Sequence, residues 1–158
     1  MIVCSDVLLF DRPNGRLGMG RKKRGVEVGK IQGYGGKLAP GETLAQCALR
    51  ELLEEAGVRA KEQNLWYVAH LTFEFPHKPE WSQVVHVFRL EHWEGEPQET
   101  EEMAPVWCDL RALPYQEMWD DARYWMPRVL EGRKVRMRFV YGEDNQTVAR
   151  AEHEEWPS

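Results

Sequence analysis

The sequence predicts an α/β fold in which helices cover a mixed β-sheet. Strand-like runs rich in β-branched and aromatic residues occur at the start of the chain and again after residue 64, on either side of a central helical stretch. A second helical stretch follows later, and this order is typical of a mixed sheet with helices packed on it. At 158 residues the chain is long enough to bury a core, and we expect a single domain, residues 1–158.

The first elements are a predicted hairpin and a glycine-rich segment. Val3–Phe10 is expected to form a strand, and the Asn-Gly pair within residues 11–15 indicates a tight turn. Arg16–Arg21 is expected to be the partner strand. Residues 25–41 are punctuated by glycines, which permit a close approach of the backbone to a ligand.

The central helix is predicted to begin after Thr43, a capping residue, and to run to about Ala56, where Gly57 ends it. Two later segments, Pro114–Trp119 and Arg123–Glu131, are expected to be helical, although Pro127 complicates the second. The remaining strands are expected at Asn64–Phe75, Gln83–Glu91, Pro105–Leu110, Val135–Tyr141 and Thr147–Ala151.

Composition narrows the function classes and the compartment. The formal net charge of −5 argues against non-specific binding to long nucleic acid, although basic residues cluster at 21–24. Three cysteines at distant positions, without Cys/His metal spacing, are expected to be reduced thiols of a cytoplasmic protein. The sequence predicts neither a signal peptide nor a membrane span, and we expect a monomer or a weak dimer.

Three carboxylates crowd onto one arc of the central helix. Glu51, Glu54 and Glu55 lie within about 100° of one another at helical geometry. Like charges one turn apart destabilise an isolated helix by about a few tenths of a kcal/mol. A divalent cation would reverse this repulsion, and Mg²⁺ binds one or two carboxylates together with substrate phosphates. The pattern indicates a metal-phosphate site, with a solvated glutamate-rich face as the alternative.

The helical wheel separates these glutamates. Glu55 falls just inside the edge of the apolar side, Glu51 just outside it, and Glu54 nearly opposite its centre. Glu51 and Glu55 are therefore expected where the helix meets the sheet, partly shielded from water. Arg50 lies beside the acidic arc and is expected to orient the carboxylates.

The spacing within residues 36–58 is more specific than the carboxylates alone. A glycine, an acidic residue, Arg-Glu-Leu, Glu-Glu and Gly-Val follow at fixed distances, at Gly36, Glu42, Arg50, Glu51, Leu52, Glu54, Glu55, Gly57 and Val58. The segment resembles the Nudix box at every defined position. The resemblance implies an α/β/α sandwich that hydrolyses a nucleoside diphosphate linked to another group.

The similarity continues outside the box. Nearly the whole chain resembles the MutT-homologue branch of the family, which hydrolyses oxidised purine nucleoside triphosphates. The matching segments are residues 22–25, 33–37, 73–75, 85–88, 102–103, 118–119 and 124–125. This resemblance implies a small-molecule nucleotide substrate, release of a monophosphate and pyrophosphate, and a role in nucleotide-pool sanitisation.

The resemblance also implies Mg²⁺ as the cofactor, with Mn²⁺ as an alternative. Glu51 and Glu55 are the first expected ligands, and Glu54 is the next ligand or the general base. The backbone carbonyl of Gly35 and the side chain of Glu102 would also meet the metal. The identity of the base stays open, because Glu51, Glu55 or Glu102 could also fill that role.

The expected base pocket matches the family less closely. Trp119 matches the tryptophan on which the base stacks, and Asp121 matches one of two aspartates that read the base edge, whereas the other falls on Ala122. A gap shifted by one residue would pair Asp120 with Asp121. Gln32 stands where the family has a shorter asparagine. These changes can alter which purine is preferred, because a mismatch leaves polar groups unpaired.

Three further substrate contacts are implied. Phe73 and Met103 match apolar pocket walls, and Lys22 is expected to contact a phosphate. Two other functions compete with triphosphate hydrolysis. One is hydrolysis of another nucleoside diphosphate derivative, such as a dinucleoside polyphosphate or ADP-ribose. The other is nucleotide binding without turnover. It fits the sequence less well, because the chain retains all the carboxylates of the box.

Overall fold

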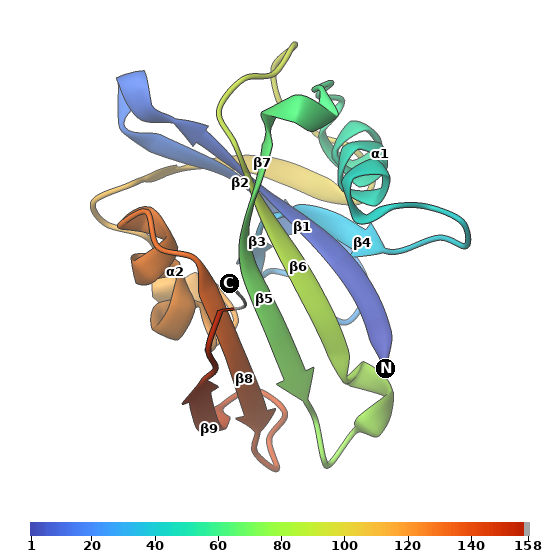
Figure 1. Cartoon of the computed structure of the whole chain (residues 1–158), viewed down its shortest axis with the longest axis vertical. Coiled ribbons are helices and arrows are strands. Elements are labelled where there is room, and N and C mark those ends of the chain that lie inside the picture. The colour runs from blue at the N-terminus through green and yellow to red at the C-terminus, as the bar shows by residue number, and fades with distance from the viewer. Residues whose placement is uncertain (157–158) are drawn as a thin grey trace.

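A mixed sheet of nine strands forms the centre of the computed structural model, which describes residues 1–156 (Figure 1). The main path is β3-β2-β1-β6-β5-β8-β9, and β4 and β7 pair with β1 and β2. β1 and β6 are parallel, as are β5 and β8. The strands are β1 (Ile2–Asp11), β2 (Arg16–Lys22), β3 (Ile31–Gln32), β4 (Tyr34–Lys37), β5 (Leu65–Glu74), β6 (Gln83–Leu90), β7 (Met103–Asp109), β8 (Val135–Tyr141) and β9 (Val148–His153).

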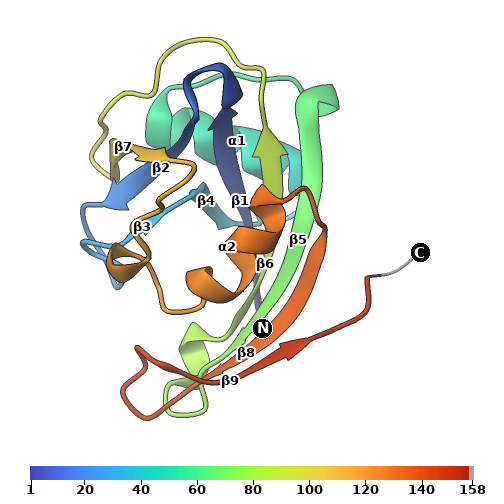
Figure 2. The same cartoon turned by 90° about the vertical axis from the view of Figure 1, so that its left-hand side faces the viewer.

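The two helices, α1 (Leu44–Ala56) and α2 (Ala122–Leu130), cover opposite faces of the sheet (Figure 2). Strand β1 contributes side chains to the hydrophobic clusters on both faces of the sheet, because successive side chains of a strand point to opposite faces. Val7 and Leu9 pack in the cluster that contains the buried side of α1. Leu8 and Phe10 pack in the larger cluster around α2. The predicted α/β/α sandwich is confirmed.

Most predicted elements are present within a residue or two. The first hairpin pairs Leu9 with Gly18, and a 3₁₀ turn (Arg12–Asn14) occupies its loop. Tyr115–Glu117 is a second short 3₁₀ turn, close to the expected segment. Helix α2 includes Pro127.

Helix α1 matches its prediction in detail. The side chain of Thr43 accepts a hydrogen bond from the backbone amide of Gln46, whose side chain accepts one from the amide of Thr43, and the helix ends at Gly57. Leu53, which helical periodicity would group with the apolar residues of α1, is nevertheless 37% exposed.

Strands β3 and β4 were not predicted. They lie in the glycine-punctuated segment, whose composition reads as a loop because glycine has low strand propensity. Tertiary pairing overrides that propensity: β4 pairs antiparallel with β1 through four residue pairs, including Asp6 with Gly35. This pairing places the glycines between β1 and α1.

Two other expectations bear on the chain as a whole. Cys4, Cys47 and Cys108 are buried free thiols, as predicted. Within residues 1–156, neither helix has the length and apolar character needed to cross a membrane.

Candidate active site

Glu55 is the most buried carboxylate of the acidic helix. Its side chain is 5% exposed, and its Oε1 accepts a 2.8 Å hydrogen bond from the backbone amide of Gly35. The Lys22 ammonium lies 3.6 Å from Oε2. Burial raises the pKa of Glu55 to about 7, although the Gly35 amide and Lys22 oppose that rise. The predicted position of Glu55 at the helix–sheet boundary is confirmed.

Glu51 lies against the same glycine segment. A Cβ atom on Gly36 would be 2.6 Å from Oε1 of Glu51, so any side chain there would displace the carboxylate. The side chain of Glu51 is 15% exposed, and its Oε1 accepts a 2.8 Å hydrogen bond from Arg50. The carboxylates of Glu51 and Glu55 therefore meet adjacent residues of β4.

Arg50 connects the acidic residues of the box. Its guanidinium donates to both oxygens of Glu42, at 2.6 and 2.9 Å, and to the carbonyl of Lys37 at 3.1 Å. Arg50 lowers the pKa of Glu42 to about 2, because a bidentate ion pair favours the charged carboxylate. This arrangement supports the expectation that Arg50 orients the carboxylates.

The remaining two glutamates occupy different environments. The side chain of Glu54 is 58% exposed and lies 3.4 Å from Arg50. Glu102, the last residue of the loop before β7, forms an ion pair with Arg24 and lies 3.4 Å from the ammonium of Lys22. Arg24 lowers the pKa of Glu102. Lys22 thus lies within ion-pair distance of both Glu55 and Glu102.

The donor set fits a hard divalent cation. Within residues 1–156 no three acidic, His or Cys side chains converge as closely as a complete metal site would require. Two carboxylates nevertheless flank Gly35 and Gly36, and Glu102 shares the Lys22 ammonium with Glu55. Carboxylate oxygens are the ligands that Mg²⁺ prefers.

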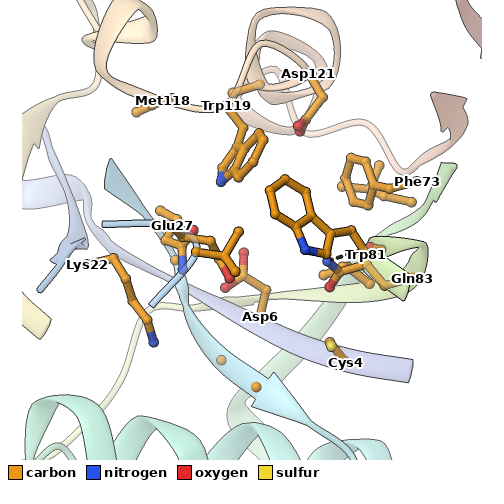
Figure 3. Close-up of a pocket in the computed structure, with 18 of the residues that line it drawn as sticks. Cys4, Asp6, Lys22, Glu27, Phe73, Trp81, Gln83, Met118, Trp119 and Asp121 are labelled. Atoms are coloured by element: carbon orange, nitrogen blue, oxygen red, sulfur yellow. Dashed lines mark hydrogen bonds between the residues drawn. The ribbon is translucent and has the colours of Figure 1, made fainter. Parts of the chain in front are cut away.

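A cavity of about 420 Å³ opens on the other side of β4 from the acidic helix. Its floor comes from β1 and the glycine segment, and its walls come from β5, from the turn before β6 and from the chain around α2 (Figure 3). Lys22, Gly35 and Gly36 also line it, so the cavity reaches the residues that the carboxylates contact. This volume is within the range of small-molecule sites.

Five predicted substrate contacts line this cavity: Lys22, Gln32, Phe73, Trp119 and Asp121. The Trp119 ring meets Tyr141 edge to face at a centroid distance of 5.8 Å, and the Lys30 ammonium lies 5.5 Å from its centroid. Phe73 stacks on Phe139 at 5.5 Å. An aromatic wall is therefore present where base stacking was expected.

The two aspartates at the start of α2 point to different places. Asp121 lines the cavity and is 7% exposed, with Oδ1 accepting from the Tyr141 hydroxyl at 2.5 Å and Oδ2 from the Trp125 indole at 2.8 Å. Burial raises its pKa. Asp120 instead accepts from Arg123 and from the Val148 amide, both at 2.8 Å. The shifted alignment that paired both aspartates on the base does not fit this geometry.

Met103 also lies elsewhere. It is fully buried in the α1-side cluster, and its methyl group lies 2.5 Å from where a Cβ on Gly20 would be. It does not line the cavity, so its assignment as a pocket wall does not fit the structure.

Sequence reasoning missed several cavity residues. Asp6, Glu27, Trp81 and Tyr141 all line the space, and Figure 3 shows Asp6 and Trp81 facing it from β1 and from the turn before β6. Burial and the nearby carboxylates raise the pKa of Asp6 well above its usual range. The sequence signal for Asp6 was a charged residue inside an otherwise apolar strand. No sequence pattern distinguished Trp81 or Tyr141 from an ordinary core aromatic residue.

The sandwich, the acidic helix and the adjoining aromatic cavity together define a class: an enzyme that hydrolyses small-molecule nucleotides. The chain belongs to the Nudix hydrolase family, because the NUDIX domain model matches residues 3–129. That match includes the whole acidic helix and most of the cavity.

Relatives agree with this assignment. The chain is 41% identical over 133 residues to the oxidized purine nucleoside triphosphate hydrolase of Mus musculus, covering 84% of this chain and 83% of the relative. The Danio rerio protein of the same name is 42% identical over 120 residues, covering 76% of this chain and 75% of the relative. A solved MutT protein from Bacillus halodurans, 19% identical, superposes with a TM-score of 0.82 over 99% of this chain and 100% of that structure, which shows the shared fold.

Proposed function

We propose that this protein hydrolyses oxidised or otherwise modified purine nucleoside triphosphates to the monophosphate and pyrophosphate, and so sanitises the nucleotide pool. The observation that carries the proposal is the adjacency of two sites across β4. Carboxylates contact one side of Gly35–Gly36, and an aromatic cavity of about 420 Å³ opens on the other. The relatives named for this reaction support the substrate class.

On the phosphate side, we assign the metal ligands to Glu51, Glu55, the Gly35 carbonyl and Glu102. Bound Mg²⁺, or Mn²⁺ in its place, would neutralise phosphate charge and lower the pKa of a bound water. Lys22 contacts a phosphate, because its ammonium lies at the mouth shared by the cavity and the carboxylates.

Glu54 has a lesser role in this proposal. Its exposed side chain makes it an outer ligand that approaches only when a metal is bound. The proton acceptor is one of Glu51, Glu55 and Glu102. Gln variants of these three separate the roles, because loss of a ligand weakens metal affinity whereas loss of the base lowers kcat alone.

On the base side, the purine stacks on Trp119 and packs against Phe73. Base stacking on an aromatic ring contributes about 1–3 kcal/mol. Gln32 and Asp121 meet the polar edge of the base. Each carboxyl oxygen of Asp121 accepts one hydrogen bond, Oδ2 from Trp125 and Oδ1 from Tyr141, which fixes the orientation of the group at the cavity wall.

Kinetics across a substrate panel test the proposal. The panel contains oxidised, methylated and normal nucleoside triphosphates, with and without the 2′-hydroxyl, together with ADP-ribose and a dinucleoside polyphosphate. We expect Mg²⁺-dependent, EDTA-sensitive pyrophosphate release, fastest with a modified purine triphosphate. Faster hydrolysis of ADP-ribose than of every triphosphate would contradict it.

We further propose that the protein acts in the cytoplasm as a monomer or weak dimer. Three buried free thiols support a reducing compartment. Sedimentation at micromolar concentration tests the oligomeric state, and fractionation of cells tests the compartment.

A further inference from the structure

Asp6 is a charged residue of the cavity lining to which the proposed function assigns no role. It lies in β1 opposite Gly35 of β4, and its side chain extends over Gly33. A Cβ on Gly33 would be 2.6 and 2.7 Å from the two carboxyl oxygens, so the absence of a side chain there makes room for the group. Figure 3 shows the Asp6 carboxyl group pointing from β1 into the space bordered by Trp119 and Trp81.

The protein provides little to satisfy this carboxyl group. Among residues 1–156, neither a side chain nor a backbone amide lies within hydrogen-bonding geometry of the Asp6 carboxyl group, and no basic side chain forms an ion pair with it; its carboxyl oxygens instead lie beside Gly33, at the lining of the cavity. Asp121, on the opposite wall, differs because both of its oxygens accept hydrogen bonds from buried side chains. Asp6 is partly exposed to the cavity, so a ligand that fills the cavity would remove its carboxyl group from water. A ligand that supplies a hydrogen-bond donor at this point offsets that loss, whereas one without a donor leaves the group unpaired.

The surrounding charges restrict what that ligand group can be. The charged residues that influence Asp6 most are Glu55, Glu27 and Asp121, all of them acidic. A phosphate or carboxylate of the substrate would be repelled here and is better accommodated near Lys22. An uncharged amino group of the base fits this position better, because it can donate to a carboxyl oxygen of Asp6 whether or not that carboxyl group carries its proton.

We propose that Asp6 is a specificity-determining residue that accepts a hydrogen bond from an exocyclic amino group of the purine, at the edge of the base away from Asp121. The inference rests on the proposed function and names its substrate class more closely. Preferred substrates carry a 2-amino or 6-amino group, and analogues without that group leave Asp6 unpaired. A site built on such a bond discriminates strongly against an analogue that lacks the donor.

Matched substrate pairs test this proposal. We would measure kcat/KM for 8-oxo-dGTP and 8-oxo-dITP, and for dATP and its 6-deamino purine analogue, with pyrophosphate release as the readout. For at least one pair we expect the amino-bearing member to be preferred by about 10–100-fold. Asp6→Ala should reduce this preference to less than about 3-fold.

Two further variants make the result specific. Asp109→Ala removes an aspartate of the same charge at the half-exposed end of β7 and should leave the preference unchanged. Gly33→Ala keeps Asp6 but places a Cβ where the carboxyl group lies, so it should weaken the preference without deleting an acid. If Asp6→Ala fails to fold by circular dichroism, the Gly33→Ala result decides.

Binding without turnover separates this inference from the proposed function. Quenching of tryptophan fluorescence by dGMP and dIMP, and by dAMP and its 6-deamino analogue, reports on the cavity directly, because Trp81 and Trp119 line it. An amino preference that depends on Asp6, in a protein that hydrolyses no triphosphate, would support the Asp6 assignment and reject the proposed function. Triphosphate hydrolysis with an amino preference that survives Asp6→Ala, or with none in the native protein, would overturn the assignment alone.

Discussion

The two sides of β4 are built in different ways. On the α1 side, Arg50 holds Glu42, Glu51 and Glu54, all within eight residues of it along the chain. On the α2 side, the cavity takes Asp6 from β1, Phe73 from β5, Trp119 from the loop before α2 and further residues from elsewhere. The acidic cluster around Arg50 comes from one short segment, residues 42–54, that contains most of α1. The cavity is complete only after the strands of the sheet have paired. We therefore expect substitutions at the α1-side carboxylates to lower kcat and substitutions in the cavity to weaken substrate binding.

The largest effect is expected for Glu55→Gln. Glutamine can still accept the hydrogen bond from the Gly35 amide, but it removes the charge that would bind a cation. We expect kcat to fall by about 10²–10⁴-fold, the range for loss of a general base, with little change in folding. Glu54→Gln, at an exposed position, is the matched control and should cost less than about 10-fold. Full Mg²⁺-dependent activity in Glu55→Gln would remove Glu55 from the metal site.

The pH dependence of stability provides the next largest effect. Burial raises the pKa of Glu55 from 4.5 to about 7, so the folded protein binds this proton more tightly than the unfolded chain does. Stability from this group is therefore fully present below pH 4.5 and declines as the pH rises to about 7. The decline amounts to about 3 kcal/mol in the metal-free protein.

Urea unfolding in EDTA from pH 4.5 to 8 measures this decline. Asp6 and Asp121 also have raised pKa values, so the informative quantity is the difference between the native protein and Glu55→Gln. Parallel stability curves for the two proteins would show that Glu55 is not the group responsible.

Trp119→Ala should separate binding from chemistry. Loss of a stacking surface costs about 1–3 kcal/mol, so we expect KM to rise about 10–100-fold while kcat changes much less. Trp66→Ala removes a tryptophan that is 58% exposed on β5 and lies outside the cavity, and it should leave KM unchanged. A loss confined to kcat would break the proposed division between the two sides of β4.

The smallest effect is expected for Arg50→Lys. Lysine keeps the charge but loses the bidentate contact with Glu42 and the contact with Glu51. Because the side chain of Arg50 is 34% exposed, solvent screening limits the loss of stability to about 1 kcal/mol. We expect kcat to fall about 3–10-fold through misplaced carboxylates.

Arg111→Lys, at a 92% exposed ion pair, is the control for that variant. Thermal unfolding measures the loss of stability, and steady-state kinetics measures the fall in kcat. Unchanged kinetics in Arg50→Lys would show that the carboxylates hold their positions without the guanidinium.

Prediction from the sequence succeeded where contacts are local. The burial order of Glu55, Glu51 and Glu54 followed from helical periodicity, and the cap at Thr43 followed from its neighbours. It failed for β3 and β4, because these short strands of the glycine-punctuated segment are stabilised by pairing with β2 and β1, respectively, rather than by their own propensity.

The sequence by itself determined a mixed sheet with helices packed on it and the acidic helix, since local periodicity and spacing encode both, and the resemblance of the box to the Nudix family added the α/β/α arrangement. Only the tertiary structure decided which groups line the cavity. It turned Asp120 toward Arg123, buried Met103 against Gly20 and brought Asp6 over Gly33. Such placements depend on the register between strands and on which face a side chain takes, and a one-residue shift in register would reverse them.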